Sequence, residues 1–212
     1  MITPALAFER ESVFSNLNVN AGMLQVNQND GSNLFFKLNS VNSFAYAIFE
    51  QTKTNVMQTG LVHLHNLLRW IILILLLVSI YKSYSGYSSK KQFDAGDKKF
   101  WLFTMIASHI TLLLGLYQWT FGRIGLFSTN YSSVGAVMKD KVARFFLVEH
   151  PTLMILAIVF ITLGHGMAKK AVDDETKYRK AFRYFLIALV LILAAVPWPF
   201  RDVIARPWFP GM

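Results

Sequence analysis

Four apolar stretches constrain the fold of this chain more than any other feature. They cover residues 61–81, 100–121, 143–167 and 182–200. A helix needs about 20 mostly apolar residues to cross the hydrocarbon core of a bilayer, and each stretch is close to that length or longer. Only 16% of the 212 residues are charged, whereas soluble domains carry about 25%. The sequence therefore predicts an integral membrane protein.

The connections between the four stretches are short, so neighbouring helices should run antiparallel. We expect an all-α fold, an integral membrane up-down-up-down four-helix bundle, over residues 57–212. Residues 1–56 differ, because they are rich in Asn and Ser and hold only three basic residues. That composition predicts a polar, poorly ordered N-terminal extension. The chain has no cysteine, which excludes disulfides, thiolate metal sites and cysteine nucleophiles.

Basic residues predict the orientation of the bundle. The chain has a net charge of +9, but its charges lie at the ends of the apolar stretches and form no basic stripe with interleaved aromatics. We therefore expect contact with membrane lipid and none with nucleic acid. Cytoplasmic loops are enriched in Lys and Arg, so the first and third connections should be cytoplasmic and both termini outside. The basic residues of those connections are Lys82, Lys90, Lys91, Lys98, Lys99, Lys169, Lys170, Lys177, Arg179, Lys180 and Arg183.

Ionisable residues inside the apolar stretches gather at one depth. At 1.5 Å per residue, His65 and Arg69 lie about 6 and 12 Å below the outer end of their helix, and Glu149 and His150 lie at about 9–11 Å. His109 is deeper, at about 18 Å. Such residues cost a few kcal/mol each, face the bundle interior and usually pair. One interpretation is structural: Arg69 pairs with Glu149, and the histidines hydrogen-bond neighbouring helices.

A haem b site is the second interpretation of the same layer. Haem needs an apolar slot between helices, one or two imidazole ligands, and basic groups for its propionates. His65 and His150 could bind the iron from opposite sides, with His109 as a rival ligand. Arg69 or Arg144 could hold the propionates. The sequence predicts no catalytic residue, so enzymatic activity would at most be that of a redox component.

The apolar stretches that hold these residues also resemble a known family. TGLVHLHNLLRWIILILLL, SHITLLLGLYQW, MKDKVARFFLVEHPTLMILAIVFITLGHG and AAVPWPFR resemble small bacterial four-span membrane proteins catalogued as cytochrome B or cytochrome b-like. The resemblance covers residues 57–201 and implies haem or electron-transfer association in the bacterial inner (cytoplasmic) membrane. It also implies quinone or respiratory-complex subunits as partners. The family pattern falls on His65, Arg69, His109, Glu149 and His150.

Three functions remain open from the sequence. The first is an integral membrane cytochrome b-like protein that holds haem b and passes electrons in a respiratory or redox pathway. The alternative is a haem-free structural or assembly subunit of a larger membrane complex. The third is a small transporter or proton path through Glu149, Arg69 and His109, which the lack of an internal repeat makes a weaker prediction.

Overall fold

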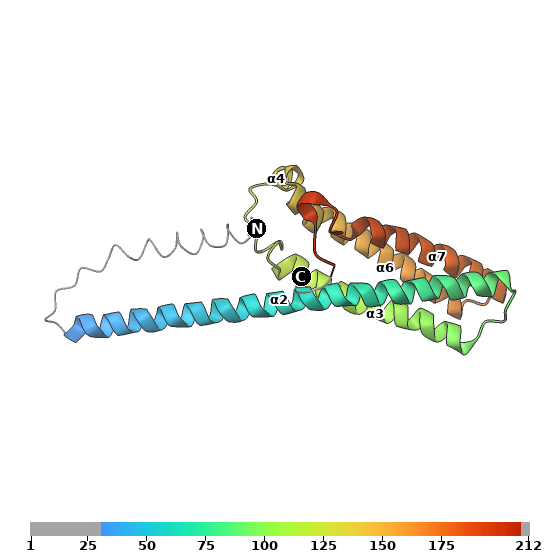
Figure 1. The fold of residues 1–212 in the computed structure, drawn as a ribbon, viewed down its shortest axis with the longest axis horizontal. Helices are drawn as coiled ribbons and strands as arrows, with labels where there is room; N and C mark the ends of the chain where they lie inside the picture. The colour runs from blue at the N-terminus through green and yellow to red at the C-terminus, as the bar shows by residue number, and fades with distance from the viewer. Residues whose placement is uncertain (1–30, 209–212) are drawn as a thin grey trace. The chain divides into compact units, whose positions relative to one another are not determined.

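The computed structural model describes residues 31–208, with side chains from residue 40 onward, and all regular structure in that range is helical. Residues 1–30 of the predicted extension lie outside the described residues. The chain divides into two compact units, residues 1–52 and 53–212. Figure 1 shows the helices. Their order is α2 (Gly31–Ser88), α3 (Ala95–Phe121), α4 (Val134–Lys139), α5 (Lys141–Arg144), η1 (Phe145–Glu149), α6 (His150–Gly166), η2 (Met167–Lys169), α7 (Asp174–Ala195) and η3 (Asp202–Ile204).

Helix α2 begins at Gly31, well ahead of the first apolar stretch at residue 61. Residues 31–56, which the composition assigned to a polar extension, are therefore helical. The unit boundary falls inside this helix, between Thr52 and Lys53. The second unit contains all of the predicted site residues.

Three of the described helical segments are long and apolar enough to cross a membrane. They are Ser40–Ser88, Ala95–Phe121 and Lys141–Lys169. The fourth predicted span, residues 182–200, does not reach that length as a helix, because α7 ends at Ala195 ahead of Pro197. Its apolar part is only about 21 Å long at 1.5 Å per residue. The preceding turn of α7 carries Arg179 and Lys180, and Arg183 lies within the stretch itself.

Helices α2 and α3 are antiparallel and in register. Along α2 the contacting residues rise in number, while their partners on α3 fall in number. Hydrogen bonds and an ion pair join the two helices. The hydroxyls of Ser79 and Thr104, for example, lie 2.7 Å apart in the buried interface. Small hydroxyl residues let membrane helices approach closely and bond across the interface. The paired residues are Gln58 with Phe121, Leu61 with Gln118, Ser79 with Thr104, and Lys82 with Asp97.

Helices α6 and α7 pack side by side, as Figure 1 shows. Gly164 makes the close approach possible, because a Cβ there would lie 2.5 Å from Cε1 of Phe185. Phe185 is fully buried and packs its ring against Trp101 of α3, with centroids 5.7 Å apart. The core therefore lies where α7 meets α3 and α6, and also includes Leu76 of α2 and Ile161 of α6.

Candidate functional site: a histidine pair near the end of the helices

Two histidines from different helices meet in the second unit. His65 of α2 and His150 of α6 have ring centroids 6.4 Å apart, with their planes at 60°. Spacing along the two apolar stretches predicted a shared depth for these residues, and the structure brings them together.

The position of His150 follows from the proline beside it. Pro151 has no N–H, so the carbonyl of Leu147 loses the helical bond that residue 151 would donate. The indole Nε1 of Trp119 on α3 donates to that carbonyl instead, at 2.9 Å. Just before Pro151 the chain widens into the π-helical turn η1, and the N–H of His150 reaches back to Phe145. Such turns occur often at functional sites.

His150 also caps the end of α7. The last carbonyls of a helix have no intrahelical partner, and Pro197 and Pro199 cannot donate to those of Leu193 and Ala195. Nδ1 of His150 bonds the carbonyl of Ala195 at 2.8 Å. A carbonyl only accepts, so Nδ1 carries the proton and Nε2 keeps a free lone pair. The neighbouring carbonyls of Leu193 and Ala194 accept from Nε1 of Trp198 at 2.8 Å and Nη1 of Arg201 at 2.9 Å.

His65 lies against the backbone of α3. A Cβ at Gly115 would be 3.3 Å from Cε1 of His65, so glycine makes room for the ring. Nδ1 of His65 is buried and has no hydrogen-bond partner among the described residues. A buried ring nitrogen without a partner costs free energy unless a ligand satisfies it.

Arg69 lies one helical turn beyond His65 and is only 8% exposed. Its Nη2 donates to the carbonyl of Trp208 at 3.0 Å, which also accepts from the indole of Trp70. The guanidinium lies 5.4 Å from the ring centre of Trp70 and 6.0 Å from that of Trp198. Its Nε is buried without a partner, and it makes no ion pair with an acid within residues 40–208.

Glu149 pairs with Arg144 rather than Arg69. Nε of Arg144 donates to Oε1 of Glu149 at 2.8 Å, and both side chains are about two-fifths exposed. The sequence interpretation that paired Arg69 with Glu149 is therefore wrong. Glu149 lies in the π-helical turn, facing the chain that precedes it, whereas Arg69 lies on another helix beneath the C-terminal segment.

His109, the rival ligand, lies apart from the pair. It is exposed on α3, and its Nδ1 bonds the carbonyl of Met105 one turn earlier, at 2.8 Å. The buried face of α3 is instead formed by Thr104, Ser108 and Thr111.

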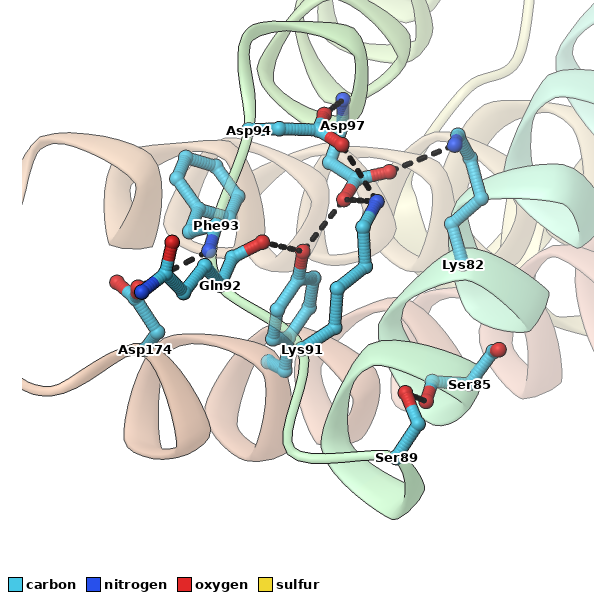
Figure 2. Close-up of polar contacts among 10 residues, drawn as sticks. Lys82, Ser85, Ser89, Lys91, Gln92, Phe93, Asp94, Asp97 and Asp174 are labelled. Carbon is cyan, nitrogen blue, oxygen red and sulfur yellow. Dashed lines mark hydrogen bonds and ion pairs between the residues drawn. The ribbon is translucent and has the colours of Figure 1, made fainter.

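A second polar cluster lies at the opposite end of the helices, and sequence reasoning missed it. Asp97 is 1% exposed and accepts from Lys82 at 2.6 Å, Lys91 at 3.0 Å and the hydroxyl of Tyr178 at 2.5 Å. Figure 2 shows Lys82 of α2 and Lys91 of the following loop converging on Asp97, and Tyr178 belongs to α7. The signal in the sequence is DAGD at 94–97, where Asp94 caps α3 by accepting from the N–H of Asp97 at 2.8 Å.

Charge pairing at this cluster shifts the pKa of its members. The bond from Lys91 and the backbone N–H of Asp97 lower the pKa of Asp94 to about 2. Burial, and then the bond to Asp97, raise the pKa of Tyr178 well above its usual value. Each shift favours the form that is present at neutral pH, so the cluster stabilises the fold.

No family model, curated protein or solved structure matches the chain. The function must therefore be argued from the geometry of the two clusters.

Proposed function

We propose that the chain is an integral membrane protein that crosses the bilayer four times. Three crossings correspond to the apolar helices in α2, α3 and α5–α6. The fourth is formed by α7 and the segment after it, because α7 runs antiparallel to α6 and its aromatic face is buried against the other helices. The Lys-rich first and third connections then face the cytoplasm, and both termini face outside. A bacterial inner membrane fits the resemblance to small four-span cytochrome b-like proteins.

Within this bundle, we propose that His65 and His150 hold haem b, and that the protein transfers electrons. The observation that carries the proposal is the meeting of the two imidazoles, with centroids 6.4 Å apart. Imidazoles bound to one metal ion from opposite sides, at about 2.0–2.1 Å each, would place their ring centres about 6.4 Å apart.

The donor set suits a porphyrin better than a bare ion. Among the described residues no group of three or more His, Cys, Asp or Glu is close enough together to hold a metal. Haem iron would need only imidazoles from the chain, and His65 and His150 would supply them. The orphaned Nδ1 of His65 is the structural feature that fits such a group.

Each residue of the site then has a defined task. The Ala195 carbonyl fixes the tautomer and orientation of His150, as outer partners do for metal-binding histidines. Arg144 is engaged by Glu149, so Arg69 is the arginine left to bind a propionate. Bound haem supplies a one-electron couple, with a quinol or a respiratory subunit as the exchange partner.

The visible spectrum of the detergent-purified chain, oxidised and dithionite-reduced, tests the proposal. The wild type from haem-sufficient cells should show a Soret band with sharpened bands on reduction. His65→Ala and His150→Ala should each lose most of it. His109→Ala is the matched control, since that histidine is exposed and bonds only its own helix; it should keep the full band. A folded, colourless wild type overturns the haem proposal.

One observation favours the haem-free structural subunit as a second candidate. His150 caps α7 whether or not a cofactor is bound, and completes the partners of the last carbonyls of that helix. A structural role predicts that His150→Asn, which can still donate a hydrogen bond, keeps the stability that His150→Ala loses. The haem role predicts that the same variant folds but stays colourless.

A further inference from the structure

The two ends of the helices use different basic residues. We call the end with the α2–α3 and α6–α7 connections the Asp97 end, and the end with the α3–α6 connection and the C-terminal segment the His150 end. Within residues 57–208 the Asp97 end has nine lysines and two arginines, and the His150 end has two lysines and five arginines. Arg, unlike Lys, presents a planar fork of donors that matches phosphate oxygens. The arginines of the His150 end are Arg69, Arg123, Arg144, Arg201 and Arg206.

Two of these arginines lie against the rings of two neighbouring phenylalanines. The guanidinium of Arg201 lies 5.0 Å from the ring centre of Phe145, and that of Arg206 lies 5.1 Å from the ring centre of Phe146. The two rings touch edge to face, with centroids 5.0 Å apart. Each ring of the aromatic pair on the π-helical turn thus has a positive charge against it.

No carboxylate among the described residues neutralises these two charges. Glu149, the acidic residue of η1, forms its ion pair with Arg144. Arg201 uses Nη1 for the carbonyls of Ala194 and Val196, which leaves its other nitrogens available. Desolvation, and then repulsion by Arg123, lower the pKa of Arg206.

The surroundings of the pair are apolar and exposed. Phe200, directly before Arg201, is 72% exposed, and Val203, between the two arginines, is 63% exposed. Arginines interleaved with large apolar side chains at the end of membrane-spanning helices contact head groups and acyl chains at once. A soluble anion would use the arginines and leave the apolar side chains exposed.

We propose that Arg201 and Arg206, over Phe145 and Phe146, bind the phosphate of an anionic phospholipid whose acyl chain covers Phe200 and Val203. The site depends on the proposed membrane insertion and is independent of haem. It couples lipid binding to the C-terminal segment, because Arg201 also caps α7.

Thermal unfolding of the delipidated, detergent-purified full chain tests this site. Phosphatidylglycerol should raise the melting temperature by several degrees more than phosphatidylcholine with the same acyl chains, since a ligand that binds only the folded state stabilises it. Arg206→Gln should remove about half of the difference or more. Arg206→Lys should restore only part of it, because the charge returns without the fork.

The control removes charge at the other end, two positive charges against the one that Arg206→Gln removes. Lys99→Gln with Lys170→Gln, both at exposed positions of the Asp97 end, should keep the whole phosphatidylglycerol effect. Retention of phosphatidylglycerol in native mass spectra provides a readout that a loss of stability alone does not change. Three outcomes overturn the proposal: equal stabilisation by phosphatidylcholine, equal stabilisation by inorganic phosphate, or a full lipid effect in Arg206→Gln.

Discussion

The polar clusters at the two ends of the helices differ in how fully their buried atoms are bonded. At the Asp97 end, the carboxylate receives bonds from Lys82, Lys91 and Tyr178, and its partners come from three separate segments. At the His150 end, Nδ1 of His65 and Nε of Arg69 are buried without partners. Outside its cluster, the Asp97 end also has buried atoms without partners, Nε1 of Trp101 and Nδ1 of His165. A fully satisfied network specifies a fold, whereas unsatisfied buried atoms cost stability and need another reason to exist.

This contrast assigns the two ends different roles. The Asp97 end stabilises the packing of α2, α3 and α7. Under the proposed function, the His150 end gives up stability for a site that a ligand completes. Changes at the Asp97 end should therefore alter unfolding and leave ligand binding intact, whereas changes at the His150 end should reduce ligand binding and have smaller effects on unfolding.

Asp97→Asn should cause the largest loss of stability. The substitution leaves Lys82 and Lys91 without their shared buried partner, and breaking a buried pair costs about 3 kcal/mol or more. Thermal unfolding in detergent measures the loss. Asp94→Asn is the control, because Asp94 is exposed, and its effect should be far smaller. An equal loss in both variants would show that burial of Asp97 contributes nothing.

Gly86→Ala should come second. A Cβ at Gly86 would lie 2.5 Å from Cε1 of Tyr178, which is fully buried. Overpacking of this kind costs about 1–3 kcal/mol. Gly60→Ala provides the comparison, since no atom lies within 4 Å of its Cβ position, and alanine there should be neutral or stabilising by up to about 1 kcal/mol. Indistinguishable melting temperatures for the two variants would contradict the packing at Tyr178.

Trp119→Phe should have a smaller effect, at the His150 end. It removes the donor to the Leu147 carbonyl, at a cost of about 1–2 kcal/mol. Pro151→Ala restores a backbone N–H that can bond the same carbonyl. The double variant Trp119→Phe with Pro151→Ala should therefore lose less stability than the two single variants together. If the two losses simply add, the N–H of residue 151 does not replace the indole as donor to the Leu147 carbonyl.

The smallest expected effect is the pH dependence of stability at the Asp97 end. The pKa of Asp94 is lowered to about 2, so its contribution is present at neutral pH and is lost as the pH falls toward that value. The pKa of Tyr178 is raised above its ordinary 10.0, so its contribution is present below pH 10.0 and is lost as the pH rises further. Tyr178→Phe should flatten the alkaline fall in melting temperature, and an unchanged alkaline fall would place its cause elsewhere.

The sequence predicted the helices better than their ends. Apolar length located α3 and α6 because a membrane-crossing helix needs about 20 such residues. The same rule overextended the fourth helix to residue 200, although Pro197 removes the donor that would have bonded Leu193. The start of α2 at Gly31 was missed because its first turns carry no strongly apolar pattern.

The site was predicted in part for a similar reason. Depth along a helix follows from residue number alone, which is why His65 and His150 could be matched. Partner choice depends on side-chain direction, so the pairing of Glu149 with Arg144 required the π-helical turn to be known. The Asp97 cluster draws on three segments distant in sequence, and its only local sign is the cap of α3.

Electron paramagnetic resonance of the oxidised, detergent-purified protein tests the central claim most directly, because it reports the ligands of the iron. Two imidazoles from His65 and His150 predict a low-spin ferric signal, which Gly115→Ala should perturb by displacing the ring of His65. A high-spin signal in the wild type, or a low-spin signal that persists in His65→Ala, would contradict the paired-histidine site.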